Sequence, residues 1–266
     1  MQDNHKMMEN KLEFIDTHIH LYDEAYGTEQ DEVITKAQAA GISKMIQPDI
    51  DSHERDKMFA ISDQHPGVLF TMLGLYPGSV EKNWEEEMAM MYDYLDRDIV
   101  AIGEIGLDYH YSADTAELQK RALGAQFELA ARLDLPVNIH MRDATEDFLK
   151  VVSQYRHLGL RGNLHAFSGS YETFMALQKY GDWSVGIGGV LTFKKSRLPE
   201  VVKRIPLEKI FLETDGPYLA PVPVRGTRND SSNIPIIAAK IAEIKEISIE
   251  EVASVTTANA KRIFKI

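Results

Sequence analysis

Residues 13–20 read EFIDTHIH, a short apolar run that ends in two histidines separated by one residue. The same pattern, a brief apolar segment with a ligand-type residue near its carboxyl end, recurs along the chain. The other segments are IVAIGEIG (99–106), LPVNIH (135–140), RGNLH (161–165) and KIFLETD (209–215). Short, continuous apolar runs are typical of buried parallel strands. The pattern therefore predicts parallel strands that carry His and carboxylate side chains near their ends.

The spacing of these segments indicates how many strands the fold contains. An eight-unit βα chain of this length averages about 33 residues per unit. On that scale the intervals between the ligand-type residues of successive segments correspond to three units, one, one and two. This assigns the segments to strands 1, 4, 5, 6 and 8. Further strand-like runs (SKMIQ, GVLFTML and DWSVGIG) and helical segments lie between them. We predict an α/β fold, a TIM-type (β/α)8 barrel, with the ligand-type residues on the face where barrel enzymes work.

The composition is typical of a folded protein. Of the 266 residues, 44% are hydrophobic and 26% are charged. A chain of this length can form one barrel or two ordinary domains, and the absence of a Pro/Gly/Ser-rich linker favours one. We expect a polar N-terminal leader at residues 1–12 and the barrel at 13–266. The leader lacks the apolar core of a signal peptide, so a cytoplasmic protein without a membrane or obligate protein partner is expected.

The charge limits the classes of function. The net charge is −12, with 29 basic and 41 acidic residues, whereas proteins that coat nucleic acid usually present a basic surface. A nuclease that grips only a strand end remains compatible, because bound cations and a few local basic residues can reverse the field in a cleft. The chain has no cysteine, which excludes disulfides and thiolate metal sites and leaves His and carboxylates as ligands.

Six residues at the predicted strand ends have side chains that suit a metal site. Two of them, His18 and His20, are two residues apart, so they point to the same face of a strand. Four imidazoles and two carboxylates exceed the needs of one tetrahedral ion and suit two ions about 3.5–4 Å apart. We expect Mg, Mn or Zn, although this ligand type also admits Ni and Fe. The expected ligands are His18, His20, Glu104, His140, His165 and Asp215.

The ligands can be divided between the two ions. We place His18, His20, Glu104 and Asp215 on one ion, and Glu104, His140 and His165 on the other, so that Glu104 bridges the pair. Polar residues of matching parity on the same segments are expected to position the imidazoles. These positioning residues are Asp16, Asn138 and Asn163.

A set of motifs spread over the whole chain resembles a known family. FIDTHIH, GEIGLDY, PVNIHMRDA, NLHAFSG, FLETDGPYLAP and RGTRN, with the closing EEVASVTTANAKRIF, resemble the motifs of the TatD family of metal-dependent deoxyribonucleases. The resemblance implies a distorted TIM barrel of the amidohydrolase superfamily, a divalent-metal site and hydrolysis of phosphodiester bonds in DNA. The six expected ligands fall on the family's metal-binding positions.

One segment departs from the family pattern. In GLYPGSV (74–80), Tyr76 and Gly78 occupy positions that many members fill with His and with an acidic residue or His. Strand 3 carries no expected metal ligand, so metal binding should survive this change. Substrate contacts near Tyr76 are expected to differ.

These features together predict a nuclease that acts on single strands or exposed ends of DNA. Asp215 and Glu104 are the expected catalytic residues, with Asp215 as the proton acceptor for the attacking water. Arg142 lies two residues after His140 and is expected to contact a phosphate, or alternatively to form a salt bridge at the start of the next helix. The loop after strand 8 is the other expected phosphate site. Its candidate residues are Arg225, Arg228 and Asn229.

Two other functions fit the same residues. One is the hydrolysis of a small phosphoester, an amide or a lactone by the same metal centre. The other is a non-catalytic, metal-dependent binding protein, which the intact set of ligands argues against. The bridging role of Glu104, in place of the modified lysine of many amidohydrolase sites, favours the nuclease.

Overall fold

Eight parallel strands form one sheet, in which each strand pairs with its neighbour in the sequence. The structure is a computed structural model that describes residues 12–266, so the expected leader at 1–12 lies almost entirely outside the described residues. The strands are β1 (Phe14–Asp16), β2 (Ile42–Gln47), β3 (Leu69–Leu73), β4 (Ile99–Asp108), β5 (Val137–Arg142), β6 (Arg161–Leu164), β7 (Asp182–Ile187) and β8 (Ile210–Leu212).

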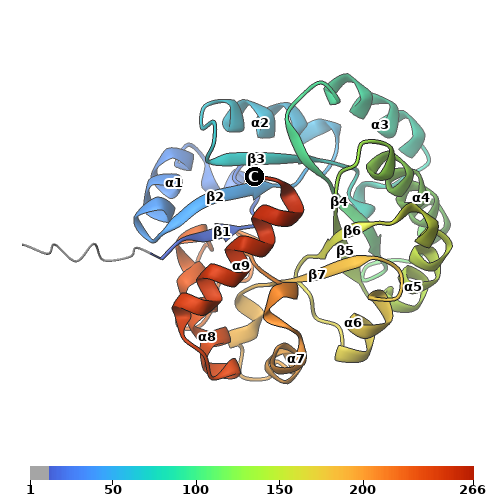
Figure 1. The fold of residues 1–266 in the computed structure, drawn as a ribbon. Coiled ribbons are helices and arrows are strands. Elements are labelled where there is room, and N and C mark those ends of the chain that lie inside the picture. The colour runs from blue at the N-terminus through green and yellow to red at the C-terminus, as the bar shows by residue number, and fades with distance from the viewer. Residues whose placement is uncertain (1–11) are drawn as a thin grey trace, which may run out of the picture.

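Helices follow the strands and surround the ring that they form (Figure 1). The α-helices of the described residues are α1 (Gln30–Ala39), α2 (Ser52–Asp63), α3 (Trp84–Met91), α4 (Ala116–Arg132), α5 (Thr145–Gln154), α6 (Tyr171–Leu177), α7 (Leu198–Arg204), α8 (Ile234–Lys245) and α9 (Ile249–Phe264). The predicted single-domain TIM-type barrel is confirmed. No helix within residues 12–266 is both long enough and apolar enough to cross a membrane.

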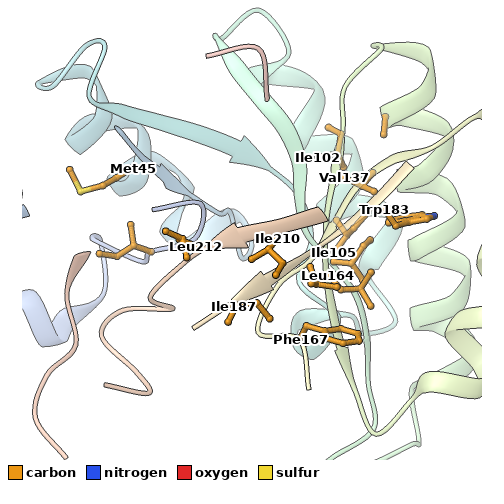
Figure 2. Packing of buried hydrophobic residues seen from close by; sticks show 14 of the residues in the cluster. Met45, Ile102, Ile105, Val137, Leu164, Phe167, Trp183, Ile187, Ile210 and Leu212 are labelled. Carbon is orange, nitrogen blue, oxygen red and sulfur yellow. The ribbon is translucent and has the colours of Figure 1, made fainter. Parts of the chain in front are cut away.

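The core lies on both sides of the strands. A large cluster fills the space between the ring and the helices, and Figure 2 shows part of it, including Ile105 on β4, Leu164 on β6 and Trp183 on β7. A second cluster packs Phe264 of α9 against Phe211 of β8 and other strand residues. Helix α9 therefore covers the amino ends of the strands, which leaves the carboxyl ends free to carry a site.

The ring closes between β1 and β8, which are adjacent but do not pair as regular strands. The backbone N–H and the hydroxyl of Thr17 both donate to the carbonyl of Leu212, at 3.0 and 3.1 Å. The buried carboxylate of Asp16 accepts hydrogen bonds from the backbone N–H and hydroxyl of Thr214 and from the hydroxyl of Ser231. Side chains thus replace part of the regular ladder at this junction, which we call the β1–β8 seam.

Strand β4 carries the irregularity that positions the centre of the site. Its pairing with β5 changes register between Ile102 and Ile105, on either side of Glu104. Gly106 lies so close to β5 that a Cβ there would stand 1.8 Å from the carbonyl oxygen of His140, and its φ of 151° disfavours other residues. Only glycine lets the two strands approach in this way. Glu104 and His140 are brought together as a result.

Candidate metal centre

The six predicted ligands converge at the carboxyl ends of five strands. Two follow β1, one lies within β4, one lies within β5, one follows β6 and one follows β8, which agrees with the predicted strand assignment. Glu104 differs slightly from expectation, because β4 continues beyond it to Asp108. Four of the six are buried and two are partly buried. The ligands are His18, His20, Glu104, His140, His165 and Asp215.

Four donor atoms form a first group. His18 Nε2 lies 3.2 Å from His20 Nε2, 3.4 Å from Glu104 Oε2 and 3.6 Å from Asp215 Oδ1. His20 Nε2 lies 3.8 Å from Glu104 Oε2 and 3.3 Å from Asp215 Oδ1. Four donors placed about 2.1 Å from a tetrahedral ion are about 3.4 Å apart. The donor atoms of His18, His20 and Asp215 all lie within 4.8 Å of one another, so these three residues could hold one divalent ion, with Glu104 Oε2 beside the two histidines.

The other oxygen of Glu104 belongs to a second group. Glu104 Oε1 lies 2.9 Å from His140 Nδ1 and 2.8 Å from His165 Nε2, and these two nitrogens are 3.2 Å apart. The rings of His18 and His165 stack with centroids 3.8 Å apart, so the two groups adjoin. Donor atoms of His18, Glu104 and His165 also lie within 4.8 Å of one another. Glu104 thus lies between the two groups, with one carboxylate oxygen toward each.

The far ring nitrogen of His18 is held by an amide. Asn138 donates a hydrogen bond through Nδ2 to Asn163 Oδ1, at 3.1 Å. Its own Oδ1 therefore faces His18 Nδ1, at 3.0 Å, and accepts a hydrogen bond from it. This leaves His18 Nε2 unprotonated toward the site. The two asparagines therefore position an imidazole, but that of His18 and not of their sequence neighbours. Asp16, expected to orient an imidazole, instead accepts from the backbone N–H of His18 and binds across the β1–β8 seam.

The far nitrogens of His20 and His140 also meet acceptors. Tyr22 donates its hydroxyl proton to the carbonyl of Pro48, at 2.6 Å, and so accepts from His20 Nδ1, at 2.9 Å. Asp108 Oδ2 accepts from His140 Nε2, at 2.8 Å. These bonds occupy the far nitrogens and leave the nitrogens that face the ligand cluster for a metal ion. Burial acts to lower the pKa of His140, but Asp108 and Glu104 raise it to about 9, so a metal ion takes the place of a proton on this ring.

His165 has a buried Nδ1 without a hydrogen-bond partner, and Glu213 is its nearest carboxylate, 3.8 Å away. Glu213 accepts from the backbone N–H of Ala166 and has no exposed surface. Burial raises the pKa of Glu213 well above its ordinary value. Glu213 thus fixes the chain next to His165 without adding a charge to the site.

Charge in the site favours cations. Burial acts to raise the pKa of Glu104, but His165, His140 and His18 together hold this pKa well below its usual value. Burial is likewise outweighed at Asp215, whose pKa is lowered by the hydrogen bond with His20 and by the charges of nearby imidazoles. Both carboxylates are therefore anionic at neutral pH. The donor set, the charge of its two carboxylates and the spacing all fit a divalent metal site.

Comparison with known proteins shows the family of the chain. A model of the TatD related DNase family matches residues 15–265. The chain belongs to the TatD family. It is 37% identical over 253 residues to the "Uncharacterized metal-dependent hydrolase YabD" of Bacillus subtilis, covering 94% of this chain and 98% of that protein. It is 32% identical over 269 residues to the "Putative deoxyribonuclease tatdn3" of Danio rerio, covering 94% of this chain and 97% of that protein.

Solved structures show the same fold. The crystal structure of YjjV, a TatD homolog from Escherichia coli, superposes with a TM-score of 0.88 at 27% identity and covers 95% of this chain and 98% of that one. An uncharacterized amidohydrolase from Saccharomyces cerevisiae shares the fold with a TM-score of 0.81 at 20% identity. The chain is thus a metal-dependent hydrolase of the TatD family on a TIM barrel.

Three residues that hold the ligands were not anticipated, although the sequence contained a signal for each of them. Tyr22 shares the parity of His18 and His20, and Asp108 shares the parity of Glu104 within the same strand. Side chains of equal parity point to one face, so both could have been assigned to the site. Glu213 likewise shares the parity of Asp215, two residues later, and could have been assigned in the same way.

Two of the predicted phosphate contacts are exposed cations at the rim of the site. Arg142 ends β5 and lies over the ring of Tyr111, 5.6 Å from its centroid. Arg225 lies over the ring of Phe193, 4.0 Å from its centroid. Among the ion pairs of residues 12–266, none involves either guanidinium. The alternative of a salt bridge for Arg142 is therefore not observed, and both charges are available to an anion.

The other two predicted contacts have structural partners instead. Arg228 donates to Glu29 Oε2 at 2.6 Å and to the carbonyl of Ala25 at 2.9 Å. Asn229 has no exposed surface, and its amide donates to the carbonyls of Thr214 and Tyr218, at 2.8 and 2.7 Å. These bonds hold the loop after β8 against the barrel. A substrate role for Asn229 does not fit its burial, and the charge of Arg228 is already paired.

The two residues that depart from the family pattern after β3, Tyr76 and Gly78, depend on each other. The hydroxyl of Tyr76 donates to Asp108 Oδ2, at 3.2 Å, and its ring meets the ring of His140 edge-on, with centroids 5.0 Å apart. A Cβ at Gly78 would stand 2.4 Å from the Tyr76 ring. Tyr76 can lie here only because residue 78 has no side chain. Its hydroxyl supports the same carboxylate that holds His140.

Proposed function

We propose that this protein is a nuclease that uses two divalent metal ions to hydrolyse phosphodiester bonds of DNA, as an exonuclease on single strands or exposed ends. The observation that carries the proposal is the placement of Glu104, whose two carboxylate oxygens face two separate groups of donors. Two ions about 3.5–4 Å apart suit in-line displacement at phosphorus, where the attacking and leaving oxygens both need stabilisation.

The chain supplies the proton acceptor and the ion bridge. When bound, the divalent ions supply an acidified water and stabilise charge on phosphate oxygens. Asp215 directs Oδ1 at His18 and His20, which leaves Oδ2 to accept a proton. Its side chain is 16% exposed, so a substrate-side water can reach it. Glu104 is only 4% exposed and serves as the fixed bridge.

The rim of the site favours a nucleic acid over a small neutral substrate. Arg142 on β5 and Arg225 after β8 offer unpaired guanidinium groups at the carboxyl ends of the strands. Guanidinium groups recognise phosphates with good geometry. A lactone or an amide has no anionic group for them to bind. The name of the Danio rerio relative, a putative deoxyribonuclease that covers nearly all of this chain, also favours a nucleic-acid substrate.

A substrate panel tests the proposal. Metal-loaded protein is incubated with single-stranded DNA, duplex DNA, a nitrophenyl phosphodiester and simple lactones, each with and without chelator. We expect metal-dependent release of nucleotides from single-stranded DNA, faster than from blunt duplex. Turnover of lactones or small phosphoesters with intact DNA would instead support the small-molecule hydrolase. Metal binding without turnover of any substrate would support a binding protein.

A further inference from the structure

The most exposed large apolar side chain of residues 12–266 lies beside the ligand cluster. Tyr111, in the loop after β4, is 87% exposed, whereas Tyr218 is 53% exposed and Tyr92 is 49% exposed. No hydrogen bond of the Tyr111 hydroxyl occurs within the described residues. An aromatic ring contributes to folding mainly through the area that it buries. Tyr111 therefore contributes little to the stability of the fold.

Its position is nevertheless fixed from two sides. The guanidinium of Arg142 lies 5.6 Å from the centroid of the Tyr111 ring, and the ring of His110 meets it edge-on at 4.8 Å. His110 Nδ1 in turn pairs with Asp143 Oδ2, at 2.8 Å, which ties the loop after β4 to the loop after β5. The ring is thus held by its neighbours while most of its surface stays free.

The same residues connect this ring to the ligand cluster. Asp108 accepts from the backbone N–H of His110 through Oδ1, at 2.9 Å, and from His140 through Oδ2, at 2.8 Å. His140 and Arg142 are two residues apart on β5, a rise of about 6.6 Å. A strand whose reacting phosphate lies at the ligands therefore brings its neighbouring nucleotide to Tyr111 and Arg142.

We propose that Tyr111 and Arg142 form a subsite for one nucleotide of a single strand, in which the base stacks on the Tyr111 ring and Arg142 contacts the adjoining phosphate. This inference rests on the proposed nuclease function. An unstacked base has a free face for an aromatic ring, and such stacking tolerates any sequence. In a duplex both faces of each base are already stacked. The subsite therefore selects single strands and frayed ends.

The chain contains a matched control pair. Tyr92 is also exposed, and the guanidinium of Arg132 lies 5.5 Å from its ring centroid. This pair lies in the outer helical layer, where Tyr92 follows α3 and Arg132 ends α4. It places an exposed tyrosine beside an arginine away from the ligand cluster, with the difference that Arg132 also donates to the Tyr92 hydroxyl, at 3.1 Å. A general effect of exposed tyrosines will appear at both places.

The test measures binding of oligothymidylate, made hydrolysis-resistant by phosphorothioate linkages, to metal-loaded protein by fluorescence anisotropy. We expect Tyr111→Ala to raise Kd about 5- to 150-fold, the effect of losing one base–aromatic stack. Tyr111→Phe should bind within about twofold of the parent, because the ring is kept. Tyr111→Leu should not rescue binding, and Tyr92→Ala should leave Kd unchanged. A second ligand, the matching oligomer of abasic deoxyribose phosphate, should bind equally to the parent and to Tyr111→Ala.

The outcomes separate this inference from the proposed function. The inference is overturned if Tyr111→Ala binds like the parent, if Tyr111→Leu binds as well as Tyr111→Phe, or if the parent does not distinguish the abasic oligomer. Binding that depends on Tyr111, in a protein that cleaves no DNA, would refute the nuclease and leave the subsite standing. Cleavage of DNA by a protein whose binding does not depend on Tyr111 would refute the subsite and leave the nuclease standing.

Discussion

At the scale of single residues, the far nitrogens of the histidines are the most informative feature of the site. Three histidines each donate a hydrogen bond from the ring nitrogen that faces away from the ligand cluster: His18 to an asparagine, His20 to a tyrosine and His140 to an aspartate. Histidines that only fill a core have no need for a common direction of their lone pairs. Here the facing nitrogens all lie close to Glu104 or Asp215, which is the arrangement expected of a metal site.

Asp215→Asn tests the proposed proton acceptor. Asn has nearly the same shape, so the barrel should remain folded, while one anionic ligand and the proton acceptor are lost. General-base assistance alone contributes roughly 10²–10⁴-fold. We expect turnover of single-stranded DNA at saturating metal to fall at least about a thousandfold.

Thermal unfolding in chelator provides the control for this variant. The parent and Asp215→Asn should unfold at similar temperatures when both are free of metal. Turnover within about tenfold of the parent would show that another group accepts the proton.

At the scale of elements, β7 and β8 are joined to α9 by one carboxylate. Asp182 begins β7 and pairs with Lys209, just before β8, and with Arg262 of α9, at 2.8 Å. Burial acts to raise the pKa of Asp182, but the hydrogen bonds from Lys209 and Arg262 outweigh it and lower this pKa. A lowered pKa in the folded state means that the pair stabilises the fold when the carboxylate is ionised.

Asp182→Asn should therefore show a stability loss that depends on pH. The free energy of unfolding should fall by no more than about 1 kcal/mol at neutral pH, because the carboxylate is 38% exposed and its pairs are screened. The difference between parent and variant should begin to shrink as the pH falls below about 4, the ordinary pKa of an unfolded Asp, and should vanish as the pH falls through the lowered pKa of the folded state. Urea unfolding at several pH values measures both quantities.

Asp63→Asn provides the comparison for this element. Asp63 pairs with Arg97 and is 61% exposed, so its replacement should be nearly neutral. A constant stability difference between Asp182→Asn and the parent from neutral to acid pH would refute the role given to the Asp182 carboxylate.

The elements themselves were largely predictable, and the bonds between them were not. Continuous apolar runs and period-3.6 patterns are local, so the strands that carry Glu104 and His140 and the helices between them could be assigned from the sequence. The partners of Asp16 depend on how the first and last strands meet, which no local pattern contains. The sequence also could not show that Arg142 is exposed whereas Asn229 is buried, because this depends on the conformation of the chain after each strand.

At the scale of the whole molecule, metal binding should be coupled to the stability of the barrel. The donors come from five strands, and ions that bind only the folded state stabilise it by mass action, by about 2.7 kcal/mol at a hundredfold excess over Kd. We expect two ions per chain in titrations with Mn, Zn or Mg, and a higher unfolding temperature with metal than with chelator.

Glu104→Gln is the decisive variant for this stoichiometry. The amide keeps the shape of the bridge but removes its charge and one of its acceptor oxygens, so occupancy of both groups should weaken together. Stoichiometry that stays at or below one for the parent with every metal would refute the two-ion arrangement. Loss of only one ion in Glu104→Gln would refute the bridge.

The β1–β8 seam has a consequence for the timing of synthesis. The first donor group takes His18 and His20 from the start of the barrel and Asp215 from its end. A chain that leaves the ribosome holds both histidines long before residue 215 has been made. No partial chain can complete this donor group until the last strand has reached the first. We therefore expect the proposed nuclease activity to be absent during translation, while the chain is surrounded by nucleic acid, and to arise only when the ring has closed.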